Sequence, residues 1–222
     1  IVSKLAEENT IDCLNEYIAS KFKDKEFIGL SLKKLGSSAR WTTMNPPNTK
    51  QLDKAKKVRF IRSKTLQELT AFSAMDVYFV FAPSGSKTKD SFQARNFAGT
   101  NRGDWKLEIK GEFAAQGKIQ GQVMRNLLTA AGFSKPVPNE PSFDDCKPGS
   151  NKVQAINKEI YDIMNGLSPK PKGWNAKTAQ AEIRTKDASW RYSKLAGLRL
   201  LEWLMSLPQS DANRATKEMY LY

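Results

Sequence analysis

The chain has 222 residues, enough to bury one main hydrophobic core and a smaller second one. It carries 36 Lys and Arg against 23 Asp and Glu, a net charge of +13, and 40% of its residues are hydrophobic. This composition excludes a disordered tail. No apolar run reaches the roughly 20 residues that cross a bilayer. The surplus of basic residues favours nucleic acid over a membrane as the partner.

Histidine is absent from the chain, which excludes Ser-His-Asp and Cys-His catalysis and every metal site that needs histidine. Cys13 and Cys146 are too few for a structural zinc site, and without a secretory segment they indicate a reduced, intracellular chain. Catalysis would rest on carboxylates, lysines, hydroxyls and a hard cation such as Mg²⁺. The chain opens at Ile1 without methionine, which indicates processing or truncation.

The first third of the chain predicts a helix followed by short strands. Thr10 is a suitable N-cap, and apolar residues at helical spacing continue to Phe22. Strands are expected at residues 27–34, 39–44 and 58–61, with Pro46 and Pro47 ending the second.

The middle of the chain predicts an antiparallel meander. Residues 77–82, 91–97 and 105–113 are three strand-like runs separated by polar turns that contain glycine. Gly117 is expected to open a helix that ends at Gly132.

The C-terminal part predicts helices after a linker. Residues 135–151 are rich in proline, and apolar stripes follow at 153–167 and 195–207. The expected fold is therefore α+β: a central, mostly antiparallel or mixed sheet with flanking helices in a domain at 1–134, a linker at 135–151 and a helical appendage at 152–222.

One candidate site lies at the end of the expected strand 27–34. Side chains alternate along a strand, so Ser31 and Lys33 share a face. A lysine beside a small polar group at a sheet edge suits a site that holds a scissile phosphate or a metal-bound water. The alternative is an ordinary solvated strand end.

Three short motifs carry a resemblance to known proteins, namely Gly-Leu-Ser-Leu-Lys-Lys at 29–34, Arg-Asn-Phe at 95–97 and Glu-Ile-Lys-Gly at 108–111. The first resembles the (D/E/S)-x-K half of the PD-(D/E)XK nuclease motif, and the set resembles poorly characterised tailed-phage proteins. The resemblance implies Mg²⁺-dependent hydrolysis of DNA phosphodiesters, with Lys33 as catalytic lysine and Ser31 in place of an acidic ligand. It also implies a viral protein found in the host cytoplasm or the virion.

A second candidate site under the same resemblance matches the E-x-K form directly. Glu108 and Lys110 share one strand face, and Asp76 opens an earlier strand. Asp76 and Glu108 would then be metal ligands and Lys110 the catalytic lysine. A charged strand face turned to solvent is the alternative.

Basic residues near these motifs predict contacts to phosphates, with DNA favoured over RNA. The candidates are Lys34, Arg59, Arg62, Arg95, Arg102 and Lys118. The segment 111–119 resembles a P-loop, but it has one residue too many and Ile119 where Ser or Thr should stand. No nucleotide cofactor is therefore expected, and two cysteines without histidine predict no zinc site. Gly117 and Lys118, at the expected helix start, would still hold a backbone phosphate through free amide N–H groups.

A different class of function stays open. A non-catalytic virion or assembly protein would turn its positive surface to the packaged genome or to acidic subunits. Self-association into a homo-oligomer, or binding to a viral assembly partner, suits this alternative.

Overall fold

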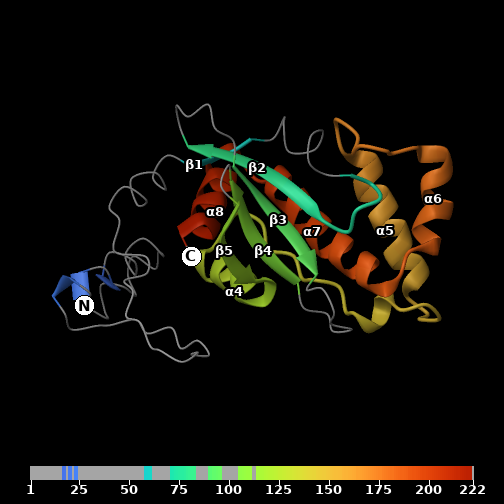
Figure 1. Cartoon of the computed structure of the whole chain (residues 1–222), viewed down its shortest axis with the longest axis horizontal. Coiled ribbons are helices and arrows are strands. Elements are labelled where there is room, and N and C mark those ends of the chain that lie inside the picture. The colour runs from blue at the N-terminus through green and yellow to red at the C-terminus, as the bar shows by residue number, and fades with distance from the viewer. Residues whose placement is uncertain are drawn as a thin grey trace, which may run out of the picture.

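The structure is a computed structural model that describes residues 17, 18, 20, 21, 23, 24, 58–61, 71–83, 90–96, 105–111 and 114–221. The described strands are β1 (Val58–Phe60), β2 (Val77–Pro83), β3 (Asp90–Asn96), β4 (Trp105–Gly111) and β5 (Ala114–Gln120). The helices that follow them are α4 (Gly121–Ala131), the short 3-10 turn η1 (Asp144–Cys146), α5 (Val153–Gly166), α6 (Ala176–Thr185), α7 (Ala188–Ser206) and α8 (Gln209–Leu221). Helices thus gather behind and beside one sheet (Figure 1).

The sheet is a five-stranded antiparallel meander in the order β1-β2-β3-β4-β5, which confirms the predicted α+β class. Val77, Ala94, Leu107 and Ile119 lie opposite one another across β2 to β5. All four are buried, and the positions that alternate with them along the strands carry mostly polar side chains, with the buried Val80 as an exception. Because side chains alternate along each strand, the sheet has one apolar face and one polar face.

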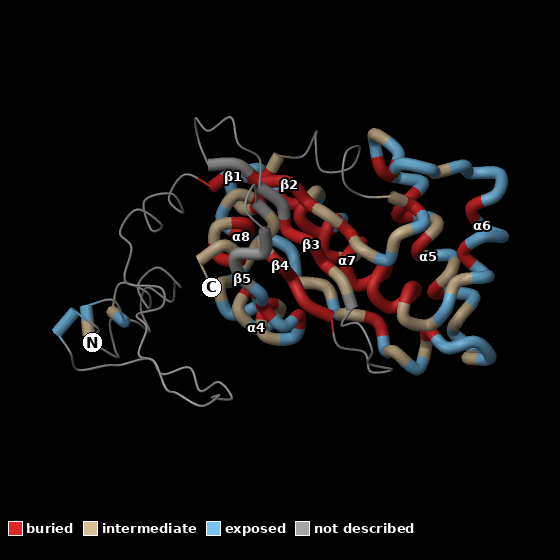
Figure 2. Tube along the Cα trace, in the orientation of Figure 1, coloured by how far each residue is buried: buried red, intermediate tan, exposed pale blue. Residues whose placement is uncertain are grey.

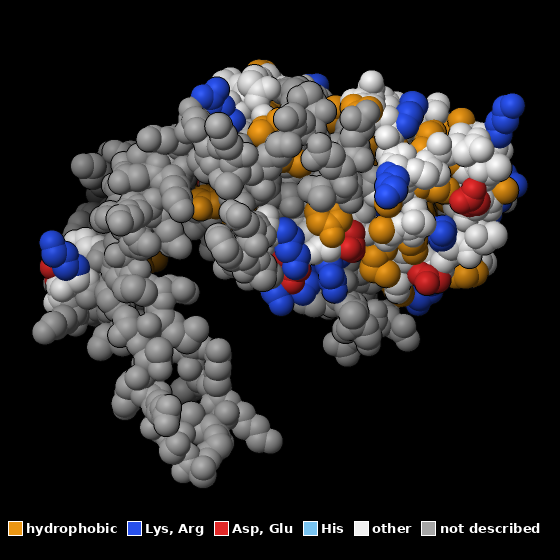
Figure 3. All heavy atoms as spheres, turned by 45° about the horizontal axis from the view of Figure 1, so that its top comes forward, with side chains coloured by type: hydrophobic (Ala, Val, Ile, Leu, Met, Phe, Trp, Pro, Cys, Tyr) orange, Lys and Arg blue, Asp and Glu red, His pale blue; other side chains and the backbone are white. Residues whose placement is uncertain are grey.

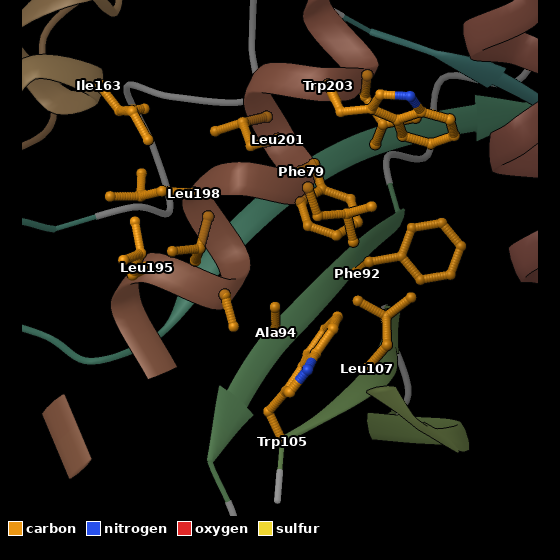
Figure 4. Close-up of a cluster of buried hydrophobic side chains, with 14 of the residues drawn as sticks. Phe79, Phe92, Ala94, Trp105, Leu107, Ile163, Leu195, Leu198, Leu201 and Trp203 are labelled. Atoms are coloured by element: carbon orange, nitrogen blue, oxygen red, sulfur yellow. The ribbon is translucent and has the colours of Figure 1, made fainter. Parts of the chain in front are cut away.

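Helix α7 covers the apolar face of the sheet and forms the centre of the core. It packs against β2 and β3 on one side and against α5 on the other. In Figure 4 the α7 residues Leu198 and Leu201 lie between the sheet residues Phe79 and Ala94 and the α5 residue Ile163. Figure 2 shows the same continuity, since buried chain runs from the central strands into α7 while the outer side of α6 is exposed.

Close approach of α7 to the sheet depends on a glycine. A Cβ at Gly197 would lie 2.7 Å from Cβ of Val77 and 3.3 Å from Cβ of Ala94. Only a residue without a side chain lets the helix backbone approach the sheet this closely.

Side chains of α7 also hold the segment that leads into β2. Trp190 Nε1 donates to the carbonyl of Ser73 at 3.0 Å. Lys194 Nζ donates to the carbonyls of Ala71 at 3.0 Å and Asp76 at 3.1 Å. With the Ser193 hydroxyl, which donates to the Met75 carbonyl at 3.3 Å, α7 side chains satisfy four backbone acceptors in the segment 71–76.

The edge strand β1 is closed by α8. The amide of Phe60 donates to Asn213 Oδ1 at 3.0 Å, and Gln209 Nε2 donates to the Phe60 carbonyl at 3.1 Å. Backbone groups at the edge of a sheet are otherwise open to pairing with another strand. Hydrogen bonds to Asn213 and Gln209 of α8 thus satisfy both the amide and the carbonyl of Phe60.

The expected helix start at Gly117 is wrong. Gly117 is paired with Ile109 inside the sheet, β5 continues to Gln120, and the helix begins at Gly121. The spacing of Ile119 and Val123 fits a helix, but Ile119 is a buried strand residue between exposed Lys118 and Gln120. A short strand that runs directly into a helix gives a mixed hydrophobic period, which explains the error.

The segment 135–151, where the sequence predicted a linker, packs on the helices. It contains η1 with the fully buried Cys146, and Arg199 of α7 donates to the Asn139 carbonyl at 2.9 Å. The sheet and the helices on both sides of this segment share one hydrophobic cluster. None of the helices in the described part of the chain is long and apolar enough to cross a membrane.

Candidate nucleic-acid interface on the polar face of the sheet

The polar face of the sheet places a row of four side chains across β2 to β5. Tyr78 lies opposite Gln93, Gln93 opposite Glu108, and Glu108 opposite Lys118. This row follows from the antiparallel register, because residues directly opposite each other on neighbouring strands point to the same face of the sheet.

Glu108 lies at the centre of a lysine cluster. Its Oε1 is 2.8 Å from Lys106 Nζ and 3.3 Å from Lys118 Nζ, and its Oε2 is 2.9 Å from Lys110 Nζ. Lys106 and Lys110 flank it at two-residue spacing on β4, and Lys118 faces it from β5. The three lysines therefore reach both carboxylate oxygens of one acid.

The charge state of Glu108 follows from these contacts. Only 3% of the residue is exposed, and burial by itself raises the pKa of a carboxyl group. The hydrogen bonds from Lys106, Lys110 and Lys118 outweigh this effect and lower the pKa of Glu108 to about 2. Glu108 is thus ionised across the physiological pH range.

Asp76 joins the row through Gln93. Gln93 Nε2 donates to Asp76 Oδ2 at 2.6 Å and to the Tyr78 hydroxyl at 2.7 Å. Burial, with the nearby charge of Asp76, raises the pKa of Tyr78, which therefore stays a neutral hydroxyl. Gln93 Oε1 is buried and accepts no hydrogen bond within the described part of the chain.

Basic side chains outnumber acidic ones on this polar face. Among the side chains that the structure describes on it, five basic residues, Arg59, Arg95, Lys106, Lys110 and Lys118, accompany two acids, Asp76 and Glu108. Exposure of the side chain rises from 10% at Lys106 to 34% at Lys110 and 57% at Lys118, and Arg59 is exposed. Figure 3 shows basic side chains gathered around acidic ones on the side of the molecule that it presents.

The structure brings together most of the site residues predicted from the middle of the sequence. Asp76, Glu108 and Lys110 lie on one face, as the second candidate site requires. The predicted phosphate contacts on this face are Arg59, Arg95 and Lys118. Ser31, Lys33, Lys34, Arg62 and Arg102 lie outside the described residues.

Lys118 reaches this face by a different route from the one expected. The sequence placed it at a helix start, where free amides would hold a phosphate. In the structure it is a strand residue opposite Glu108, and its ammonium group is the contact. The expected cradle of helix amides at Gly117 and Lys118 is therefore wrong.

Sequence reasoning missed Lys106 and Gln93. Lys106, Glu108 and Lys110 form a Lys-x-Glu-x-Lys pattern, and two-residue spacing on a strand would have placed all three together. Gln93 carries no comparable signal, because its role depends on the β2–β3 register.

Asp76 and Glu108 do not form a magnesium site as arranged. Both Glu108 oxygens already contact ammonium groups, so a dication would approach against three like charges. In the part of the chain that the structure describes, no group of three or more Cys, Asp or Glu side chains is placed to hold a metal.

Comparisons with protein-family models, with curated proteins and with solved structures find no match to this chain. The function proposed below therefore rests on the geometry of the polar face.

Proposed function

We propose that the protein binds nucleic acid through the polar face of the sheet, with Lys110, Lys118, Arg59 and Arg95 directed to the phosphate backbone. The observation that supports this most is the lysine cluster on Glu108, in which one acid holds three ammonium groups side by side. One negative charge cannot neutralise three positive ones, so the cluster keeps a net positive charge.

Glu108 has a positioning role in this proposal. Lysine side chains are flexible, and fixing them costs conformational entropy. The buried Glu108 carboxylate accepts hydrogen bonds from Lys106, Lys110 and Lys118, so these side chains are already partly fixed before the ligand binds. The result is an ordered positive surface that binds phosphates without a preference for particular bases.

The test removes the two more exposed lysines of the cluster. A Lys110→Gln, Lys118→Gln variant is titrated against a fluorescent DNA duplex by anisotropy from about 50 to about 300 mM NaCl. Each lost phosphate contact is expected to lower the salt slope of log affinity by about 1, so the variant slope falls by about 2.

The matched control removes two lysines in the helical region. Both side chains are exposed: Lys177 lies on α6, and Lys172 lies before α6, where its backbone pairs with Ala71. Neither residue belongs to the polar face, so a Lys172→Gln, Lys177→Gln variant removes the same charge from elsewhere. It is expected to bind like the unmodified chain. Equal loss in both variants would mean that overall charge, rather than the polar face, binds the duplex, and no salt dependence at all would contradict the proposal.

A nuclease is the second candidate, supported by the contact between Glu108 and Lys110 on one strand face with Asp76 on the same face. Phosphates that draw Lys110 and Lys118 away would free Oε2 of Glu108, while Lys106 would still contact Oε1. Cleavage of DNA with and without Mg²⁺ tests this candidate, with Asp76→Asn as the variant expected to lose activity. Binding without cleavage by the unmodified chain would favour the non-catalytic virion or assembly protein.

The place of action proposed with either function is the host cytoplasm or the virion. This follows only from the resemblance to phage proteins. Copurification of the chain with assembled particles would favour the virion.

A further inference from the structure

A pocket of about 740 Å³ lies among α5, α6, α7 and Pro148, which follows η1, and no strand residue lines it. We call it the helical pocket. Its polar lining comes from Gln154, Asn157 and Lys158 of α5, Gln180 and Arg184 of α6, and Arg191 of α7. Three of these side chains are basic and none is acidic, so the pocket is positively charged.

Arg191 is a buried cation of the pocket, and no carboxylate among the described residues forms an ion pair with it. Only 3% of the residue is exposed. Its guanidinium donates to Asn157 Oδ1 at 2.8 Å, to the Cys146 carbonyl at 3.1 Å and to the Arg184 carbonyl at 2.9 Å. All three acceptors are neutral.

A buried charge without a counter-ion is costly, and Arg191 reflects this cost. Burial lowers its pKa, and the charge of Asp187 opposes that shift without an ion pair. Three hydrogen bonds leave two of the five guanidinium N–H groups without an acceptor among the described residues. Bound anionic oxygens would supply both the missing acceptors and the missing charge.

The first turn of α5 adds further donors to the pocket. Lys152 at the N-cap provides no side-chain acceptor for the helix, and Val153, Gln154 and Ala155 all line the pocket. The amides of Gln154 and Ala155 precede the first intrahelical hydrogen bond, from Ile156 to the Lys152 carbonyl. Unpaired amides at the positive end of a helix dipole favour an anion.

Arg184 and Lys158 stand at the exposed side of the same pocket. Lys158 pairs with Asp162, which lies outside the lining, at 2.5 Å. The guanidinium of Arg184 has no hydrogen-bond partner within the described part of the chain. A guanidinium group of this kind binds two oxygens of one phosphate at once.

We propose that the helical pocket binds a phosphate monoester, with the phosphoryl oxygens held by Arg191, Arg184 and the first amides of α5. The pocket volume falls within the range of sites for small organic ligands and exceeds what a phosphate ion needs. Gln154 and Gln180 supply neutral donors and acceptors for the remainder of the ligand. The proposed ligand is therefore a nucleoside monophosphate or a molecule of similar size.

The test is a titration of the full chain, followed by NMR, with inorganic phosphate and then AMP at constant ionic strength. Saturating shifts are expected at the amides of Gln154 and Ala155 and at Arg191 Nε, with AMP binding more tightly than phosphate. Arg184→Gln is the variant, because Arg191 also ties three elements together and its loss would disturb the fold. Loss of a charge-assisted contact is expected to weaken AMP binding by a factor of roughly 10.

Lys177→Gln is the matched control, since Lys177 is exposed on the same helix and does not line the pocket. It is expected to bind AMP within about twofold of the unmodified chain, because one distant exposed charge contributes little. Shifts that do not saturate, or equal weakening in both variants, would overturn the proposal. A 5′-phosphorylated tetranucleotide that displaces AMP, where its 5′-hydroxyl form does not, would support a strand end as the source of the phosphate; no displacement by either would support a free nucleotide.

Discussion

Lys194 is the most unusual single residue in the described part of the chain. It is fully buried on α7, and its ammonium group donates to two backbone carbonyls and lies 5.5 Å from the Trp190 ring centre. Burial lowers its pKa to about 7, although the charge of Asp76 opposes this shift. The folded protein therefore loses this proton far more readily than the unfolded chain does.

This difference predicts how stability depends on pH. From pH 7 to 9 the unfolded chain keeps the Lys194 proton and the folded protein releases it, so the free energy of unfolding should rise with pH. The contribution approaches about 1.4 kcal/mol per pH unit at most. Urea unfolding across this range, compared with a Lys194→Met variant, measures it.

The Lys194→Met variant is expected to lose the slope because it has no group there that titrates. A flat profile for the unmodified chain, or an equal slope in both proteins, would contradict a buried lysine with a lowered pKa. Cys146 acts in the opposite direction toward pH 9, because burial raises the pKa of its thiol to about 11 while the unfolded thiol begins to lose its proton. This contribution is the same in both proteins and cancels in the difference between their slopes.

The sequence did not predict the burial of Lys194 for a physical reason. A lysine on an amphipathic helix normally extends to solvent. Here the carbonyls of Ala71 and Asp76, more than a hundred residues away in the chain, accept hydrogen bonds from its ammonium group. Glu108 differs from Lys194 in this respect. Lys106 and Lys110 lie two residues before and after it on the same strand, so this spacing alone predicts that they contact it.

At the scale of elements, the packing of α7 on the sheet depends on Gly197. An added methyl group would meet Val77 at 2.7 Å and Ala94 at 3.3 Å, and both are backed by other core residues. Alanine is the better helix former by about 1 kcal/mol. Overpacking is expected to outweigh this gain, because the helix and the sheet would have to separate.

A Gly197→Ala variant should therefore lower the free energy of unfolding by about 1–3 kcal/mol. The control is Gly166→Ala at the end of α5, where an added Cβ meets nothing within 4 Å. It should be neutral or slightly stabilising. Chemical denaturation of both variants decides, and a Gly197→Ala protein as stable as its parent would refute close packing at this crossing.

The elements themselves were partly predictable. The strands at β1 to β4 and the helices α5 and α7 have strong local patterns, and the structure confirms them. Helices α6 and α8 fall in the predicted helical region but were not predicted individually, because they are polar over most of their surface. Their buried residues are largely small or polar, such as Ala179, Ala212, Ala215 and Thr216. A small buried residue gives a weak hydrophobic period.

At the scale of the whole molecule, one core joins the sheet to the C-terminal helices. Phe79, Phe92 and Leu107 on the apolar face belong to the same cluster as Leu198 and Leu201 of α7. A sheet with an uncovered face of this kind lacks the burial that a stable fold needs. The prolines in 135–151 indicate a boundary locally, but a sequence pattern does not report which elements pack together over long distances.

A fragment of residues 1–134 is accordingly expected not to fold by itself. It would lack α7 and α8 and would expose the apolar face of the sheet, so dye binding to hydrophobic surface should rise and the thermal transition should lose cooperativity. Calorimetry of the fragment beside the full chain measures this. A sharp transition with a native-like enthalpy in the fragment would show that the sheet is an independent domain.

The contact between α8 and β1 has a consequence for how this protein tolerates mutation. Asn213 and Gln209 recognise the backbone of Phe60, which every residue except proline presents in full. Position 60 is therefore free to vary among apolar residues of similar size without loss of these bonds. The two α8 side chains have no such freedom, so selection against strand-mediated aggregation should act on Gln209 and Asn213 more than on which apolar residue fills position 60.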